Sequence, residues 1–198
     1  MEYQRLDNQT FYIQLKNFGE TSDTDFTAAL SELKTYPQIK KLIIDVRNNP
    51  GGYLTEVSDM LGHFVPAGEA TAIVRTSGKE SAYKSHGYTT IDTSKYQIII
   101  LQNGWSASAS EILTGTLKDY FPNAVIIGEK SFGKGSVQSL KSYYDGSTLK
   151  YTSAKWFTGK TAKWIDGIGI MPDIEIKYDD ELYKTSKIDN QLQKALDY

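Results

Sequence analysis

The sequence predicts an α/β domain built from strand-turn-helix units. Short apolar, β-branched runs recur along the chain, and each is followed by a turn and then by apolar residues at helical spacing. Strands that are apolar throughout are buried on both faces, and their alternation with helices is typical of a largely parallel sheet. The 198 residues contain no repeat, low-complexity tract or linker, so we expect residues 1–198 to form a single domain.

The first half of the chain contains two such units. The run at 11–15 predicts a strand, and the helix expected after it has apolar residues at Phe26, Ala29, Leu30 and Leu33. The run at 41–46 predicts a second strand, which ends at an Asn-Asn-Pro-Gly-Gly turn. The helical stripe that follows consists of Leu54, Val57, Met60, Leu61 and Phe64.

The second half adds a third unit and then changes character. The run at 98–101 predicts a strand, and the stripe after it consists of Ile112, Leu113, Leu117 and Tyr120. A further strand is predicted at 124–127. Beyond Gln138 the apolar residues alternate with polar ones on both sides of 143–147, which indicates an added β-hairpin region with its turn there.

The remaining segments carry weaker signals. Residues 68–95 are irregular with a possible hairpin, and a final helix is expected at 188–196. Residues 1–8 are polar and lack the apolar centre of a signal peptide. No stretch approaches the ~20 consecutive apolar residues of a membrane span.

Composition excludes several kinds of function. The net charge of −2 gives no electrostatic footprint for nucleic acid or a membrane surface. The absence of cysteine excludes disulfides, thiolate metal sites and a cysteine nucleophile. With His63 and His86 as the only histidines, a histidine-rich metal site is not expected, and we predict neither metal nor cofactor.

The turn at the end of the second predicted strand is the first candidate for chemistry. Its two glycines, Gly51 and Gly52, allow positive φ and leave main-chain N–H groups uncovered. Such groups can bind a developing negative charge, as in an oxyanion hole. Asn, Pro and Gly also make tight strand-to-helix connections for reasons of turn geometry alone, so this segment by itself leaves both readings open.

The second candidate is Asn-Gly-Trp-Ser-Ala-Ser-Ala-Ser-Glu at 103–111, where a helix begins after a buried strand. Small residues permit a cramped turn, and the helix dipole favours negative charge there. A serine in this position is physically similar to a nucleophile elbow, although G-x-S-x-G is missing. Ser108 with Glu111 also fits a capping box, S-x-x-E, which is the alternative reading.

The third candidate is the glycine-rich stretch 128–138. Lys134 lies between two glycines, which leaves its amine uncrowded, and Gln138 follows at a distance that permits a hydrogen bond to it. A lysine acts as a base only if burial lowers its pKa from ~10.4. A Walker phosphate loop is excluded because residue 135 is Gly, which cannot bind magnesium as Ser or Thr does. A solvated loop lysine is the simpler alternative.

Neither histidine completes a Ser-His-Asp triad. His63 falls on the apolar stripe of its helix, and His86 lies in the irregular middle section beside Gly87. No neighbouring feature would orient either ring, so both are read as structural. If Ser108 is a nucleophile, Lys134 is the better candidate for its base.

In their order along the chain, the three segments resemble the carboxyl-terminal processing (tail-specific) serine proteases. The likeness covers D-V-R-N-N-P-G-G, S-A-S-A-S-E and G-K-G-S-V-Q, and it extends over 41–52, 98–117, 125–138, 145–151 and 167–174. It implies a ClpP/crotonase-like fold, which agrees with the strand-turn-helix units. It also implies a serine endopeptidase that cleaves proteins or peptides near their C-terminus through a Ser-Lys dyad and an acyl-enzyme.

The resemblance also implies roles for individual residues. The nucleophile, the general base and the glutamine that positions this base correspond to Ser108, Lys134 and Gln138. The oxyanion hole would use the main-chain N–H of Ala109 and that of a glycine, either Gly51 or Gly52. The expected partner is therefore a protein or peptide substrate, bound by its C-terminal segment.

The chain departs from the family pattern in four places. Trp105 stands where a small residue is common, 120–124 is one residue longer than usual, and 156–161 lacks a proline that often follows its aromatic pair. Family members usually carry an export signal and a PDZ domain ahead of this core, and neither is found in 1–198. We expect an excised core of a protein that acts outside the cytoplasm, and the alternative is a variant without the PDZ domain.

Two other functions remain as alternatives. A catalytically silent peptide-binding or scaffold module would keep the same fold. A crotonase-like enzyme acting on acyl-coenzyme A would also need paired oxyanion amides, but it has no use for the Ser108, Lys134 and Gln138 set.

Overall fold

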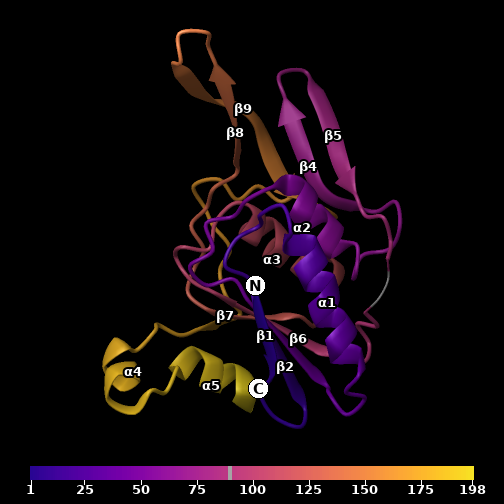
Figure 1. Ribbon diagram of the computed structural model, residues 1–198, viewed down its shortest axis with the longest axis vertical. Coiled ribbons are helices and arrows are strands. Elements are labelled where there is room, and N and C mark those ends of the chain that lie inside the picture. Colours follow the sequence, from indigo (N-terminus) through magenta and orange to yellow (C-terminus); the bar gives the residue numbers. More distant parts are fainter. Residues whose placement is uncertain (89–90) are drawn as a thin grey trace.

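The computed structural model describes residues 1–88 and 91–198, and its centre is a six-stranded sheet (Figure 1). In spatial order the strands are β1 (Glu2–Arg5), β2 (Thr10–Gln14), β3 (Lys41–Asp45), β6 (Gln97–Gln102), β7 (Val125–Gly128) and β10 (Ile174–Glu175). β1 pairs antiparallel with β2, and the other neighbouring strands are parallel. The strands predicted at 11–15, 41–46, 98–101 and 124–127 are confirmed as β2, β3, β6 and β7, with slightly different bounds.

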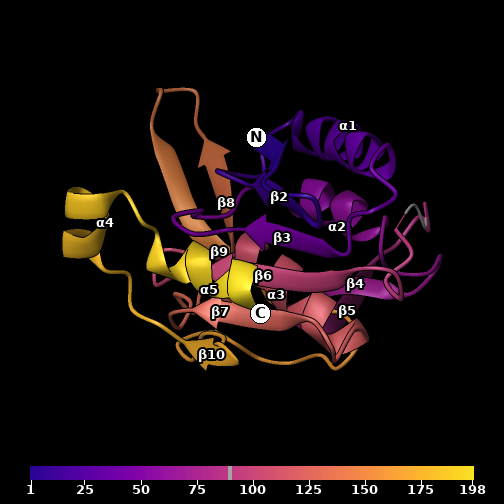
Figure 2. The ribbon, with the colours of Figure 1, turned by 90° about the horizontal axis from the view of Figure 1, so that it is seen from below.

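Alternate residues of the central strands enter two apolar cores, one on each face of the sheet. Leu42 and Ile44 of β3 pack with α1 (Ser22–Lys34), α2 (Leu54–Leu61) and α3 (Ala109–Tyr120). Ile43, between them, packs on the other side with α5 (Asn190–Asp197), which Figure 2 shows in yellow against β6 and β7. This two-sided burial explains why the strand is apolar at successive positions.

The helices expected after the first three strands are confirmed, and the expected final helix is α5. The sequence did not predict α4 (Asp180–Ser186), which projects from the body of the molecule. None of its residues is buried, so it has no apolar stripe that could have indicated a helix.

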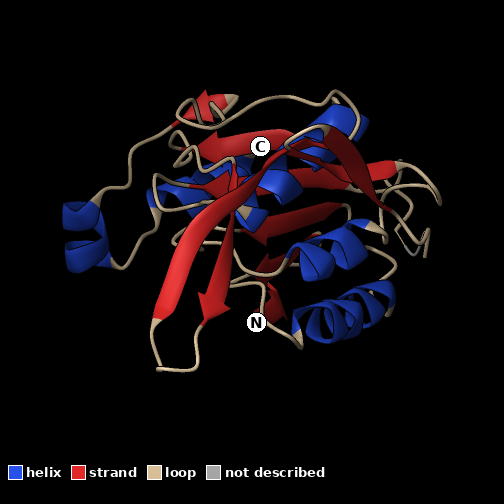
Figure 3. Cartoon of the chain, turned by 90° about the horizontal axis from the view of Figure 1, so that it is seen from above, coloured by secondary structure: helices blue, strands red, loops and turns tan. Residues whose placement is uncertain are grey.

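A second, four-stranded antiparallel sheet is built from two hairpins that project from the body (Figures 1 and 3). Its order is β5 (Lys79–Lys84), β4 (Ala70–Thr76), β9 (Thr148–Thr158) and β8 (Ser136–Ser142). The predicted turn at 143–147 connects β8 to β9, and the possible hairpin within 68–95 is β4–β5. Thr89 and Thr90 of that stretch lie outside the described residues.

Parallel pairing brings the three candidate loops to one edge of the central sheet. β3, β6 and β7 are adjacent and run in the same direction, so their carboxyl ends meet. The turn at 46–52 follows β3, the serine segment follows β6, and the lysine loop follows β7. In open α/β sheets, ligands bind at this edge.

Candidate active site

The three loops enclose a cavity of about 340 Å³ that contains most of the predicted site residues. Gly52, Ser108, Lys134 and Gln138 all line it. The rest of its wall comes from the hairpin sheet and from the start of α2, through Tyr53, Leu54, Thr55, Tyr83, Ser136, Val137 and Trp156. The cavity therefore lies between the hairpin sheet and the loops at the carboxyl edge of the parallel sheet.

Ser108 has a backbone conformation that its residue type rarely adopts. It immediately precedes α3, with φ of 57° and ψ of −116°. Positive φ at a residue with a Cβ costs about 1 kcal/mol or more and is retained mainly where function requires it. The strand-turn-helix setting and the strain together match a nucleophile elbow in geometry, although its sequence pattern is absent.

Gly51 packs directly against Ser108, and no other residue fits there. Its φ is +102°, and a Cβ at this position would lie 2.7 Å from the Ser108 Cβ and 2.8 Å from the Ala107 carbonyl oxygen. Gly52 is equally constrained, because a Cβ would lie 2.2 Å from the carbonyl oxygen of Phe18. The two glycines thus permit the turn to approach the serine closely.

The main-chain N–H groups of Gly51 and Gly52 differ in their hydrogen bonding. The N–H of Gly51 donates to Asn49 Oδ1 at 2.9 Å. Within residues 1–88 and 91–198, the N–H groups of Gly52 and Ala109 have no hydrogen-bond partner. Free N–H groups beside a candidate nucleophile can receive an oxyanion.

Glu111 joins the serine segment to the lysine loop through a fully buried carboxylate. Its Oε2 accepts from the N–H of Ser108 and of Lys134, both at 2.9 Å. Its Oε1 accepts from the N–H of Gly133 at 2.7 Å and the Ser131 hydroxyl at 2.6 Å. The carboxylate half of the predicted capping box is therefore present, and it also holds the lysine loop in place.

The glycines on either side of Lys134 admit a second loop. A Cβ on Gly133 would lie 2.8 Å from the Gly169 nitrogen, and one on Gly135 would lie 2.7 Å from the Asp166 Cβ. The Gly135 N–H also donates to Asp166 Oδ1 at 2.8 Å. These glycines fix the position of Lys134 by close packing, a role that its sequence neighbours alone did not reveal.

The structure places the proposed dyad in one cavity without joining its side chains. Among the described residues, no hydrogen bond connects the Ser108 hydroxyl and the Lys134 ammonium. Catalytic hydrogen bonds are often long in a free enzyme and tighten once substrate binds.

Gln138 uses its amide nitrogen elsewhere. This nitrogen donates to Thr152 Oγ1 at 2.9 Å and to Ser136 Oγ at 3.2 Å. The hydrogen bond expected between Gln138 and Lys134 is not among the described contacts. Because both contacts engage the nitrogen, the amide oxygen is the atom left to accept from a lysine ammonium.

Sequence reasoning missed a buried ionic junction at the end of β3. The side chain of Arg47 is 10% exposed and that of Asp45 is 0% exposed, and Arg47 Nη2 lies 2.6 Å from Asp45 Oδ2. Tyr12 donates to the same oxygen at 2.7 Å. A charged pair directly beside a glycine turn was the available signal, but it could not identify the distant partner Asp189, which lies 2.8 Å from Arg47.

The pKa values of Arg47 and Tyr12 in this junction are shifted from their ordinary values. Burial alone would lower the pKa of Arg47, but its bonds to Asp45 and Asp189 raise this pKa above the ordinary value. Burial, with the charge of Asp45, raises the pKa of Tyr12. Arg47 therefore stays charged and Tyr12 stays neutral.

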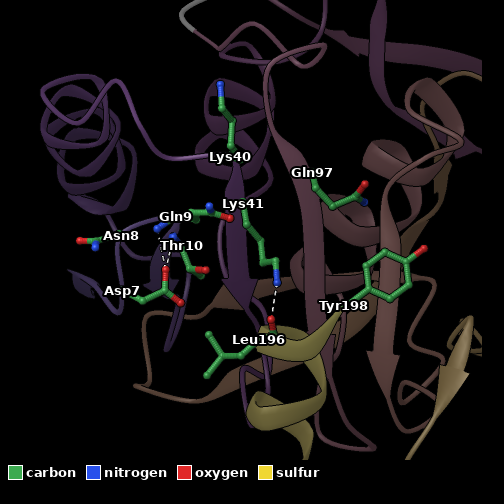
Figure 4. Close-up of a pocket in the computed structure, with 9 residues that line it drawn as sticks. All are labelled: Asp7, Asn8, Gln9, Thr10, Lys40, Lys41, Gln97, Leu196 and Tyr198. Carbon is green, nitrogen blue, oxygen red and sulfur yellow. Dashed lines mark hydrogen bonds between the residues drawn. The ribbon is translucent and has the colours of Figure 1, made fainter.

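Another cavity, of about 540 Å³, lies at the opposite ends of the strands (Figure 4). The polar groups that line it largely have hydrogen-bond partners within the protein. Lys41 donates to the carbonyl oxygens of Ala195 at 3.0 Å and Leu196 at 2.5 Å, which caps the end of α5. The Asp7 carboxylate accepts two main-chain N–H groups. This cavity contains amino ends of strands and none of the three candidate loops.

Neither histidine lines the Ser108 cavity. His63 is buried between α1 and α2, with Thr27 Oγ1 3.0 Å from its Nε2, and burial lowers the pKa of His63 to about 4. Over the part of the chain that is described, no cluster of His, Asp or Glu could hold a metal ion. The helices described there include none long and apolar enough to cross a bilayer.

Comparison with known proteins identifies the relatives of this chain. Residues 9–176 match the family model described as "Peptidase family S41". The carboxy-terminal processing protease CtpB of Bacillus subtilis (strain 168) is 41% identical over 170 residues, which are 85% of this chain and 34% of that protein. A probable CtpA-like serine protease of Staphylococcus aureus (strain N315) is 43% identical over 139 residues, which are 70% of this chain and 27% of the relative.

Solved structures show the same fold. The photosystem II D1 C-terminal processing protease superposes with a TM-score of 0.74 at 28% identity, covering 85% of this chain and 42% of that one. The tricorn protease, at 21% identity and a TM-score of 0.60, covers 96% of this chain and 17% of that protein, and it shares the fold alone. The chain thus spans about a third of the length of the curated relatives.

Proposed function

The chain belongs to peptidase family S41, and from that premise we propose that it is a serine endopeptidase with Ser108 as nucleophile and Lys134 as general base. The observation that carries the proposal is the strained backbone of Ser108, which has φ of 57° and precedes Ala109, whose N–H, like that of Gly52 in the same cavity wall, has no hydrogen-bond partner among the described residues. Lys134 lines the same cavity. Strain of this kind at a loop-to-helix junction is typical of functional sites.

The reaction proceeds through an acyl-enzyme. Neutral Lys134 removes the proton of the Ser108 hydroxyl, and the oxygen attacks the scissile carbonyl carbon. Lys134 then gives this proton to the leaving amine as the C–N bond breaks. A water molecule, deprotonated by Lys134, attacks the ester and releases the second product, which restores Ser108.

Two main-chain N–H groups stabilise the negative oxygen of each tetrahedral intermediate. They belong to Ala109 and Gly52, because the N–H of Gly51 is already bound to Asn49. Donors of this kind contribute about 3–4 kcal/mol each in comparable sites. Gly51 then has a different role, which is to let the turn lie against Ser108.

The substrate is a protein or peptide, and its proposed cleavage near the C-terminus follows the name of the B. subtilis relative, a carboxy-terminal processing protease. The side chains of Leu54, Tyr83, Val137 and Trp156 give the cavity an apolar wall that suits an uncharged substrate residue. Action outside the cytoplasm is proposed on the family resemblance alone.

Ser108→Ala and Lys134→Ala test the proposal directly. We expect each to reduce cleavage of an unfolded protein substrate to background while the unfolding midpoint stays near that of the wild type. A serine-directed fluorophosphonate should label the wild type at Ser108. Ser142→Ala, in an exposed position on the hairpin, is the matched control.

Two outcomes would contradict this assignment. Near-wild-type turnover in Lys134→Ala would exclude the Ser-Lys dyad. A wild type that neither cleaves nor is labelled would favour the second candidate, a silent peptide-binding module, for which the missing Ser108–Lys134 hydrogen bond is the supporting observation.

A further inference from the structure

The turn that contains Gly52 pairs with Phe18, whose N–H donates to the Gly51 carbonyl at 3.1 Å and whose carbonyl accepts from the Tyr53 N–H at 2.8 Å, and it is also held from two further sides. On one side it contacts the serine segment: the Asn48 N–H donates to Asn103 Oδ1 at 3.0 Å, and the Ala107 N–H donates to the Asn49 carbonyl at 3.0 Å. On the other side it begins directly after Arg47, whose guanidinium is buried in the ionic junction. Arg47 is therefore one of the groups on which the position of the turn depends.

The C-terminal helix supplies half of the contacts of this guanidinium. Arg47 Nη1 donates to Asp189 Oδ1 and to Gln191 Oε1, both at 3.0 Å, and Nη2 lies 2.8 Å from Asp189 Oδ2. Gln191 is fully buried, and its amide nitrogen donates to the Ile176 carbonyl at 2.7 Å. Asp189 and Gln191 both lie beyond residue 176, where the match to the family model ends.

Packing alone does not fix the turn on this side. A cavity of about 550 Å³ lies beside it and is lined by Asn48 and Asn103 as well as by Arg47 and Asp189. Because there is a hollow where apolar side chains could have packed, hydrogen bonds hold the start of the turn: those of Val46 with Leu101 and Ser106, and the directional bonds of the Arg47 guanidinium.

We propose that Asp189 is a positioning residue, which orients Arg47 and through it the turn that presents the Gly52 N–H to the oxyanion. The inference rests on the proposed function, since it assigns Asp189 a part in the same reaction. It places a requirement for catalysis on α5, a helix that is not among the elements carrying Ser108, Lys134 or Gly52.

The charge arrangement predicts a defect in catalysis more than in folding. Removing the charge of Asp189 leaves Arg47 paired with Asp45, so no buried ion loses all its partners. The guanidinium is then fixed by one carboxylate where it had two. A displacement of about 1 Å in a catalytic group can reduce turnover about 100-fold, so a partial loss of positioning is measurable.

Asp189→Asn tests the proposal, and the chain provides a close control in Asp179→Asn. Both residues are helix N-caps: Asp189 accepts from the N–H groups of Gln191 and Leu192, and Asp179 accepts from that of Leu182. Asparagine caps as well as aspartate does, so each substitution preserves its helix. Of these two N-cap residues, only Asp189 also binds Arg47 among the described contacts.

Steady-state kinetics and hydrogen exchange provide the two readouts. For Asp189→Asn we expect kcat to fall about tenfold or more, with KM within about twofold, and labelling by fluorophosphonate to slow in parallel. We also expect faster deuterium uptake in peptides covering 45–53. Asp179→Asn should match the wild type in all of these.

Equal kcat and equal uptake in the two variants would overturn the proposal. If the wild type itself neither cleaves nor is labelled, the proposed function fails, while the exchange measurement still decides whether Asp189 holds the turn. If Asp189→Asn does not fold, Asp189→Glu replaces it, because it keeps the charge and moves the carboxylate; unchanged kcat and uptake there would equally refute the role.

Discussion

Two largely buried side chains, Glu111 and Arg47, hold the loops of the candidate site, and they have different kinds of partners. Glu111 accepts from three main-chain N–H groups and the Ser131 hydroxyl, and no cationic side chain of the described residues forms an ion pair with it. Arg47 is a cation shared between two carboxylates, those of Asp45 and Asp189.

The difference determines what a substitution leaves behind. If Glu111 stops accepting, several N–H groups lose their partner together, and each such group costs about 1–3 kcal/mol where it is shielded from water. If Arg47 loses one carboxylate, it keeps the other. If Arg47 itself is removed, both carboxylates lose their cation. We therefore expect the loss of one carboxylate to reduce stability less than the loss of Arg47.

Arg47→Met should have the largest effect on stability. It leaves the fully buried Asp45 without its cation, and breaking a buried pair in this way costs about 3–5 kcal/mol. Urea unfolding would measure the loss. Arg75→Met is the control, because Arg75 pairs with Glu80 on an exposed hairpin and should cost at most about 1 kcal/mol. Similar losses in the two variants would contradict the ranking.

Glu111→Gln should cause the second largest loss of stability and should abolish most activity. One end of the new amide is a donor, and it would face either the N–H groups of Ser108 and Lys134 or the donors of Ser131 and Gly133. We expect a loss of about 2–4 kcal/mol in the free energy of unfolding and about 100-fold or more in kcat/KM.

The matched control for Glu111→Gln is Glu129→Gln, which alters a carboxylate that accepts from the Tyr178 N–H at an exposed position. It should change the free energy of unfolding by less than about 1 kcal/mol. If Glu111→Gln had as little effect as this control, Glu111 would not be the link between the serine segment and the lysine loop.

The smallest effect is expected from a third polar cluster, between α1 and α2, which lies outside both ionic groups. Burial, with the charges of Asp59 and Glu56, raises the pKa of Asp23 to about 6, whereas burial lowers the pKa of His63 to about 4. Below pH 6.5 the unfolded chain protonates His63 before the folded one does, so His63 costs stability as pH falls to about 4. Asp23 acts in the opposite sense, because between pH 3.8 and about 6 the folded chain keeps a proton that the unfolded chain has lost.

Asp23→Asn should therefore steepen the loss of stability between pH 6.5 and pH 4, because it removes the opposing contribution. Urea midpoints at several pH values would measure the slope. We expect kcat at neutral pH to stay at the wild-type value, which separates this cluster from the two groups at the site. A slope unchanged by the substitution would show that Asp23 does not titrate in this range.

The sequence predicted the parallel strands and the three loops because these features are local. An apolar run such as 98–101 and a pair of glycines at 51–52 are visible in any short window. The positive φ of Ser108 cannot be predicted in this way, because the residue type serine does not indicate the backbone conformation that the surrounding structure imposes. Nor could the choice between the two glycine N–H groups be made without the Asn49 side chain.

Long-range contacts were beyond sequence reasoning for a different reason. Nothing near Arg47 identifies Asp189 as its partner, since charge alone would allow many of the acidic residues. Glu111 was read as a helix cap, and its second role depends on the lysine loop folding back over α3. Both cases require the tertiary structure to bring the groups together.

The bond between Arg47 and Asp189 spans 142 positions of the chain, and this separation has a consequence for biosynthesis. Chains leave the ribosome from their N-terminus, so Ser108 and Lys134 emerge before α5 does. If Asp189 holds the turn that contains Gly52, the proposed activity stays weak until α5 docks. The order of translation would then delay the proposed activity until α5 has been made.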